Sequence, residues 1–533
     1  MFDSFTDTVR EKTGGKLPFA DAGIKIKAYF SQIAENKRMG SDLLFMVTYM
    51  ASILTADISR PEIFAFTAMR KEYATSKYIA KVETFVKRWN YNYAKALEMV
   101  ADRVKNPMLS SMLSRYGNSI SSGVPDDEFI TLELSTIRSV YRNHFEQGIE
   151  MLKKWGDAYI ALMLSATIVS VIIMVSIAIY APDDLDSTLN TSYLLILGIG
   201  IFGIGTMYRA IPGDQKCHEI PGQGSYEQKM IRRMERFILP TILIAALILI
   251  VAGFNYGLIF LIVGILLVPL GLFAIIDDTN IIDRDADFSV FIRSIGTIMG
   301  GKGLTITYAL AEIDIKTLKA LDNFIQSVYS KMNLGLDENL IWERFIDDSG
   351  SNLISKYLNI FRDSIKLGGN PSEVARVVSS SMLEQTLLRE KREMLATGFI
   401  VLLIPMHVAM IGIFIFLYEI LLTMSHAVTA VMASFTEASV ALSSSTASVG
   451  GSMSGMVNIF VNFPEAKMGT YVAIVVLMIT ICNMLAGKIV KGGGNYLYYA
   501  FGSILFTLTG VMFIVTPFIV EMLFQIPVMG GLP

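Results

Sequence analysis

The chain has 533 residues, of which 17% are charged and 53% are hydrophobic. A soluble globular chain carries about 25% charged residues, and intrinsic disorder requires low hydrophobicity and high net charge. A single compact soluble domain and a disordered chain are therefore excluded, and a polytopic membrane protein with sizeable soluble parts remains. The two cysteines, Cys217 and Cys482, are too far apart in sequence to indicate a disulfide framework or a CxxC metal site.

The first 157 residues predict a cytoplasmic helical unit. Residues 1–40 contain no apolar stretch followed by small residues, so no signal peptide is expected there, and residues 41–157 are predicted to form a helical domain. Apolar residues recur at spacings of three and four from Ile79 through Trp89 to Val100, which predicts one stripe of a single long helix. Gly123 follows a later helix, at a place that suits a positive-φ cap.

Seven segments are apolar enough to cross a bilayer, which takes about 20 residues in a helix. Four are predicted within residues 158–276, a fifth at 398–422, and the last two within 468–520. The individual segments run over 158–180, 193–208 (short for a span), 237–254, 258–276, 398–422, 468–485 and 496–520.

The basic residues predict the orientation of these spans. With residues 1–157 inside, 44 of the 45 lysines and arginines fall on the inner side, and only Lys467 falls outside. We therefore expect a multi-pass protein of the cell membrane with a cytoplasmic N-terminus and an extracellular C-terminus. The loop 209–236 is then cytoplasmic, whereas the Ser-, Gly- and Ala-rich loop 423–467 and residues 521–533 are extracellular.

A basic cluster precedes the third span. It is expected to contact lipid headgroups, and the alternative is a contact with an acidic cytoplasmic partner. Its members are Arg232, Arg233 and Arg236.

An acidic stretch follows the fourth span. It resembles the start of a calcium loop, but Phe288 stands where the glycine is required and no glutamate closes the loop. A solvated acidic loop, or charges at a helix start, is therefore expected, with an ion site or a surface for a basic partner as the alternative. The carboxylates belong to Asp277, Asp278, Asp283, Asp285 and Asp287.

Two glycine motifs do not indicate nucleotide binding. Residues 296–303 nearly match a phosphate loop, but Gly303 replaces the Ser or Thr that would hold magnesium, so a helix stop is expected. Residues 198–203 match GxGxxG inside a span, where small residues favour close helix packing. No catalytic residues, cofactor or metal site are predicted, and no nucleic-acid partner is expected. Ionisable residues within the spans are predicted only at Glu419 and Glu521, which is few for a transporter.

Residues 277–397 predict a second helical domain that repeats the first. Residues 42–54 and 287–299 are similar at an offset of 245 positions, and Gly123 aligns with Gly368 at the same offset. A turn follows in both copies, with Gly368 and Gly369 at the second one, and a charged helix then leads into a span. One offset that serves both ends of the unit indicates an internal duplication.

These paired units resemble the type II secretion system F-domain family. The resemblance lies in residues 45–54 with 118–125 and in residues 291–299 with 363–371. Four spans separate the units here and two more follow the fifth, which is similar to the archaellum (archaeal flagellum) assembly platform, the FlaJ type. The fold expected is thus all-α, with about seven transmembrane helices and two homologous cytoplasmic bundles.

The resemblance implies a non-enzymatic platform for assembly of a type IV pilus-like filament, in motility or secretion. Such platforms couple a separate cytoplasmic hexameric ATPase to the insertion of filament subunits, archaellins or pilins. Besides these partners and membrane lipids, a homodimer is expected beneath a six-fold motor. Two alternatives stay open: the platform of an archaeal adhesion pilus or secretion system, and a membrane transporter.

Overall fold

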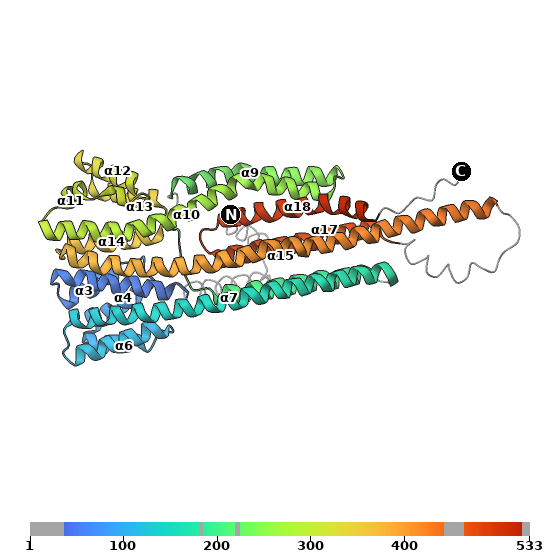
Figure 1. The fold of residues 1–533 in the computed structure, drawn as a ribbon. Coiled ribbons are helices and arrows are strands. Elements are labelled where there is room, and N and C mark those ends of the chain that lie inside the picture. Colours follow the sequence, from blue (N-terminus) through green and yellow to red (C-terminus); the bar gives the residue numbers. More distant parts are fainter. Residues whose placement is uncertain (1–36, 181–184, 219–223, 442–462, 525–533) are drawn as a thin grey trace, which may run out of the picture.

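The computed structural model describes residues 37–180, 185–218, 224–441 and 463–524, and they form an elongated assembly of helices (Figure 1). Within these ranges no β-sheet forms, and only an isolated bridge joins Cys217 and Ser351. Eight helices of this part are long and apolar enough to cross a membrane. The all-α, polytopic membrane fold predicted from the sequence is confirmed.

Two short-helix bundles lie together at one end of the molecule (Figure 1). The first follows the helix Lys37–Ala56, which ends in the 3₁₀ turn η1 (Leu54–Ala56), and comprises α3 (Arg60–Met69), α4 (Ser76–Trp89), α5 (Tyr93–Ala101) and α6 (Pro107–Ser121). The second comprises α11 (Ile306–Glu312), the 3₁₀ turn η2 (Ile315–Thr317), α12 (Asp322–Asn333), α13 (Glu338–Ser349) and α14 (Asn352–Lys366).

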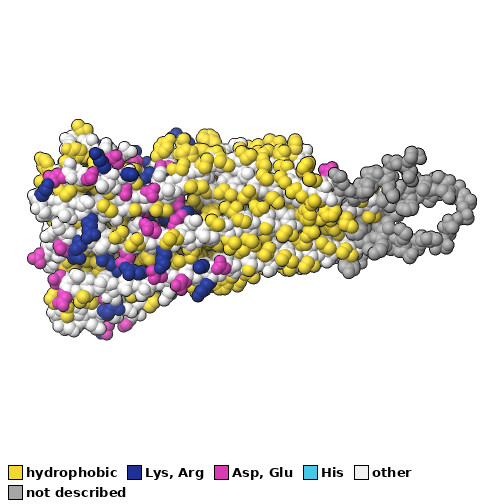
Figure 2. Space-filling view, viewed as in Figure 1, with side chains coloured by type: hydrophobic (Ala, Val, Ile, Leu, Met, Phe, Trp, Pro, Cys, Tyr) yellow, Lys and Arg dark blue, Asp and Glu magenta, His cyan; other side chains and the backbone are white. Residues whose placement is uncertain are grey.

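Seven longer helices complete the part of the chain that the structure describes. The long helices are α7 (Asp126–Tyr180), α8 (Leu185–Ala210), α9 (Tyr226–Val251), α10 (Tyr256–Lys302), α15 (Pro371–Ala441), α17 (Glu465–Lys491) and α18 (Leu497–Leu523). Charged side chains gather over the bundle end, and the middle of the molecule is covered by hydrophobic ones (Figure 2). The apolar surface is the part that a bilayer would surround.

The two bundles repeat the same local structure. Helices α3 to α7 begin 245 or 246 residues before α11 to α15. The carboxylate of Asp42 accepts a bond from the backbone nitrogen of Ala74 (2.9 Å), and that of Asp287 accepts the equivalent bond from Ala320 (2.8 Å). The same side-chain-to-backbone bond thus occurs at equivalent places in both bundles, which is difficult to obtain by chance. The structure therefore supports the duplication inferred from the sequence.

The glycine turns also match. Gly123 and Gly368 both have positive φ, 74° and 93°, and cap α6 and α14. Gly369, the second glycine of that turn, is not left-handed, because its φ lies outside that region. Its need for glycine is steric instead, since a Cβ there would lie 2.6 Å from Oγ1 of Thr55.

The predicted long helix over residues 79–100 is wrong. The chain breaks at Asn90, which takes a left-handed conformation (φ 57°) between α4 and α5. Trp89, expected in the core, is 61% exposed. The apolar spacing of three and four residues runs through the break in the sequence, so periodicity alone could not reveal the turn.

The predicted spans coincide with seven long helices, and several bounds differ. The second span extends to α8, which is 26 residues long. The fifth span does not end at 422, because α15 continues to Ala441; the expected loop 423–467 therefore starts too early, and its remainder, 442–462, lies outside the described residues. The eighth candidate, Lys37–Ala56, is 72% buried in the hydrophobic core of the bundles.

The bundles share one hydrophobic core and are also joined by polar contacts. The rings of Phe45 and Tyr357 meet edge to face with centroids 5.2 Å apart. Arg138 of α7 donates to the carbonyl oxygen of Val377 on α15 (2.9 Å) and to the hydroxyl of Ser381 (3.1 Å). A helix of one repeat is thereby attached to the corresponding helix of the other.

Close packing of α10 on α18 depends on glycines. A Cβ on Gly264 would lie 2.4 Å from the backbone nitrogen of Thr507, and one on Gly510 would lie 2.4 Å from that of Leu261. In the GxGxxG motif of α8, Gly200 and Gly203 are similarly close to neighbouring side chains, whereas Gly198 has open space around it. Small residues allow backbones to approach in lipid, where apolar burial adds little.

Gly264→Val is expected to separate α10 from α18. The substitution adds atoms where no space exists, which costs about 1–3 kcal/mol when a core is overpacked. We expect a lower thermal unfolding temperature and a broader elution peak in detergent. Gly198→Val, the matched control, should behave as the parent chain does, and equal stability of both variants would contradict the packing argument.

Candidate functional site

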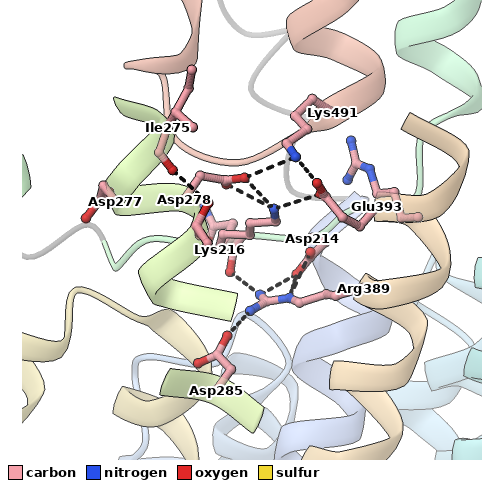
Figure 3. A network of polar contacts seen from close by, with 12 residues as sticks. Asp214, Lys216, Ile275, Asp277, Asp278, Asp285, Arg389, Glu393 and Lys491 are labelled. Carbon is pink, nitrogen blue, oxygen red and sulfur yellow. Dashed lines mark hydrogen bonds and ion pairs between the residues drawn. The ribbon is translucent and has the colours of Figure 1, made fainter. Parts of the chain in front are cut away.

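Buried ion pairs concentrate where the bundles meet the membrane helices (Figure 3). The side chains come from the inner parts of α10 and α15, from the extended segment 211–218 and from the end of α17. This junction (defined here by Asp214, Lys216, Asp278, Asp285, Arg389, Glu393 and Lys491) is the candidate functional site.

Arg389 of α15 is the centre of the junction. Its Nη1 donates to Oδ2 of Asp285 on α10 at 2.7 Å, and its Nε and Nη2 bind the carboxylate of Asp214 at 3.0 and 2.6 Å. Nη2 also donates to the carbonyl oxygen of Gln215 at 2.6 Å. The Arg389 and Asp285 side chains are 5% and 1% exposed. The guanidinium therefore makes its hydrogen bonds to groups inside the protein.

The segment 211–218 is held between the long helices and the second bundle. The carbonyl oxygen of Lys216 accepts from the backbone nitrogen of Asn352 (2.8 Å), and the backbone nitrogen of His218 donates to Gly350 (3.3 Å). Burial alone would raise the pKa of Asp214, but the guanidinium of Arg389 outweighs it and holds that pKa below its ordinary value. Asp214 therefore stays ionised and anchors the segment to α15.

A second group of charges joins the end of α17 to the same place. The Lys216 ammonium lies 2.9 Å from Oδ1 of Asp278 on α10 and 3.7 Å from the carboxylate of Glu393 on α15. Lys491, the last residue of α17, pairs with Glu393 and lies 3.7 Å from Asp278. Alternating charges thus connect α10, α15 and α17, with Lys216 in the middle.

The predicted acidic loop is wrong. The stretch lies within α10, and Asp277, Asp278 and Asp285 are buried, while Asp283 is exposed. Asp277 accepts from the Ser225 hydroxyl (2.6 Å) and the Gln228 amide. The buried carboxylates of Asp277, Asp278 and Asp285 are stable inside the protein because each binds a cation or a hydrogen-bond donor from a distant segment of the chain.

The three arginines of the basic cluster also differ in exposure. Arg232 donates to the hydroxyl of Tyr496 at 2.8 Å, whereas Arg233 and Arg236 are exposed on α9. Arg233 and Arg236 are thus the more accessible members of the basic cluster, as Asp283 is of the acidic stretch. The glycine-rich residues 296–303, which nearly match a phosphate loop, end a helix as expected, because Gly303 (φ 65°) caps α10.

A polar chain also crosses the interior of the membrane helices. The Tyr159 hydroxyl donates to Oδ1 of Asn483 (2.8 Å), and the Asn483 amide donates to Nδ1 of His407 (2.9 Å). The amide nitrogen of Asn483 can only donate, so Nδ1 of His407 accepts. The neutral ring then carries its proton on Nε2, which lies 3.1 Å from the Thr509 hydroxyl. Helices α7, α15, α17 and α18 are joined by these bonds.

Sequence reasoning missed most of this site. Lys491 was only one of the 44 basic residues counted for the orientation, and Asp214, Lys216 and Arg389 were not singled out. His407 was overlooked among the ionisable residues within spans. A signal was present for two of them, because His407 lies in the middle of an apolar run and Arg389 is three residues from Arg392 on a helix that is about to enter the membrane.

The residues of the junction hold one another through ion pairs and hydrogen bonds. Among the described residues no group of three or more His, Cys, Asp or Glu side chains is placed to hold a metal ion. The junction carboxylates already accept bonds from Arg389, Lys216 or Lys491, and such saturated pairs fix the relative positions of the segments that carry them.

Comparison with known proteins gives two relatives. Flagella accessory protein J of Methanocaldococcus jannaschii is 21% identical over 378 residues, which is 68% of this chain and 66% of that protein. Flagella accessory protein J of Methanococcus voltae is 20% identical over 383 residues, 68% of this chain and 67% of that protein. No family model and no solved structure matches the chain.

The chain is a relative of flagella accessory protein J. The resemblance to the FlaJ type that the sequence indicated is confirmed. The match spans about two thirds of the length of each relative.

Arg389→Gln is expected to destabilise the protein strongly. It leaves Asp285 and Asp214 without their cation, and breaking a buried pair in this way costs about 3–5 kcal/mol. Arg376→Gln on the same helix is the matched control, because its pair with Glu373 is exposed on both sides and contributes about 0–1 kcal/mol. Thermal unfolding in lipid nanodiscs compares the two, and equal unfolding temperatures would refute a structural role for the junction.

Proposed function

We propose that this chain is the membrane platform of a type IV pilus-like filament machine, the archaellum, and that it couples a cytoplasmic hexameric ATPase to insertion of filament subunits. One observation carries the proposal. Helices α7, α10 and α15, of 55, 47 and 71 residues, each run without interruption from a bundle into the apolar part of the molecule. A displacement of either bundle is thereby delivered to the membrane helices.

The orientation proposed has both bundles in the cytoplasm, the N-terminus inside and the C-terminus outside. It is supported by the distribution of basic residues. The lone exception, Lys467, is paired with Asp186 at 2.8 Å at the opposite end of the membrane helices. With this orientation the domains keep the roles expected from the sequence: two cytoplasmic F-type bundles and a membrane base.

Equivalent apolar turns of the two bundles are candidate contacts for the ATPase. Asn90 and Gly335 are the left-handed residues of the turns that follow α4 and α12. Each is flanked by exposed large apolar residues, Trp89 in the first bundle and Leu334 (77% exposed) in the second. A partner built of repeated subunits presents the same surface several times, so two of its subunits can bind the two equivalent turns.

A second copy of the chain is the further partner proposed. Helix α9 packs on α10, and its outward side carries exposed apolar residues, among them Phe237, Leu247 and Val251. Lipid tails or the α9 of a second copy would cover this face. Crosslinking of cysteines introduced at position 247 in native membranes would detect the dimer.

A flexible insertion in α7 tests the coupling. Gly-Gly-Ser-Gly inserted after Lys154, an exposed position between bundle and membrane, interrupts the continuous helix. We expect normal membrane insertion and ATPase copurification, together with loss of filaments. The reason is that a displacement of the first bundle is no longer passed through α7 to the membrane helices. Electron microscopy of cells that lack the chromosomal copy measures the outcome.

The same insertion after Gly123 is the control. That turn lies outside the continuous helix, and a Cβ at Gly123 would meet no atom within 4 Å. Filaments formed by both variants would overturn the coupling. The same cells identify the filament: loss of swimming indicates an archaellum, and loss of surface attachment alone indicates the adhesion-pilus alternative.

Serine at both apolar turns, Trp89→Ser with Leu334→Ser, is expected to weaken ATPase copurification at least tenfold, because central apolar contacts contribute about 2 kcal/mol or more each. Leu132→Ser, on an exposed apolar side chain of α7, is the control. Reversal of Arg233 and Arg236 to Glu examines the basic cluster in the same assay. ATPase binding unchanged in the double serine variant would exclude the turns as the docking surface.

A further inference from the structure

A cavity of about 870 Å³ opens beside the junction, where the inner ends of several membrane helices meet. Tyr208 belongs to the end of α8, Lys488 to the end of α17, and Tyr496 and Tyr499 to the turn that begins α18. Arg392 of α15 forms part of its wall. With the orientation proposed above, the cavity lies at the inner surface of the bilayer.

The lining of the cavity is strongly basic. Its acidic residues are Asp214 and Glu235, and both are occupied: Asp214 binds Arg389, and Glu235 accepts from the Tyr499 hydroxyl at 2.8 Å. Against these two stand six basic side chains, namely Lys37, Arg38, Lys216, Arg232, Arg392 and Lys488.

Three of the cations meet neutral groups rather than carboxylates within the described part of the chain. Arg392 is 4% exposed and donates to the carbonyl oxygens of Ile489 and Val490, at 3.0 and 3.3 Å. The Lys37 ammonium lies 3.9 Å from the ring centre of Tyr208. Lys488 lies 5.0 Å from that of Tyr498.

Like charges gathered in a half-buried cavity repel one another, and their repulsion is relieved by a bound anion. Phosphate suits the lining, because lysine and arginine are its usual ligands and tyrosine hydroxyls can donate to it. A metal cation would be repelled by the same side chains. The position at helix ends, with tyrosines and basic residues together, is typical of the zone of lipid headgroups.

We propose that this cavity binds a phosphate-bearing anion, and that its place at the membrane surface makes an anionic lipid headgroup the source. Lys37 and Lys488 contact the phosphate from opposite helix ends. The headgroup then bridges α17 and the helix Lys37–Ala56, whose first residue lies against Tyr208 of α8, so lipid composition stabilises the junction. The assignment concerns the chain alone and does not depend on the ATPase or the filament.

Native mass spectrometry of the purified chain tests the site. Phosphatidylglycerol, phosphatidylcholine and inorganic phosphate are added separately, and the bound fraction is measured for the parent and for Lys37→Gln with Lys488→Gln. We expect phosphatidylglycerol binding to fall roughly tenfold in the double variant, the loss of two basic contacts. Phosphatidylcholine binding should not change.

Arg233→Gln is the matched control, because Arg233 is a basic residue of the same region that is exposed and does not line the cavity. It should bind phosphatidylglycerol as the parent does, and Lys488→Arg should retain most binding. Thermal unfolding without added lipid verifies that the double variant is folded. Binding of inorganic phosphate that needs the two lysines, without lipid binding, would support the phosphate site and assign it a soluble source. Equal lipid binding by the double variant and the parent would overturn the proposal.

Discussion

The buried guanidinium of Arg389 is the constraint on which the arrangement of the long helices depends. It binds Asp285 of α10 and Asp214 of the segment 211–218, and both partners are inside the protein. Desolvation of such charges is offset only when their geometry is satisfied. The angle between α10 and α15, and the path of the segment between α8 and α9, are thus restricted to the arrangement in which all three charges meet.

This constraint belongs to the second repeat alone. At the offset of 245 residues, Asp285 corresponds to Gly40 and Arg389 to His144. Gly40 and His144 instead line a cleft of about 950 Å³ between α7 and the end of α8. The duplication therefore preserved the bundles with their caps, while the connection to the membrane became an ion pair in one repeat and an open cleft in the other. Two equal bundles with unequal attachments respond differently to the same force.

The sequence predicted what short-range patterns encode. Apolar runs located the seven membrane helices, and the paired glycines Gly123 and Gly368 identified the duplication, since both signals are local or repeated at a fixed distance. The junction could not be predicted, because its partners lie 62 to 213 residues apart and charge alone does not reveal which carboxylate turns inward. The acidic stretch was misread for this reason: in sequence, buried and solvated aspartates look alike.

The unequal attachments bear on how the proposed platform would move. Bundle 2 is connected to the membrane through α10 and α15, which Arg389 joins, whereas bundle 1 is connected through α7. A stiff pair resists bending more than a single helix does, so a push on bundle 2 would move its spans as one body. The same push on bundle 1 reaches the membrane through α7, beside the cleft that His144 lines. If a motor acts on the two bundles as proposed, its push therefore reaches the membrane helices through a joined pair of helices at one bundle and through one helix at the other. The two repeats, although alike in their bundles, would therefore not respond alike to the same force.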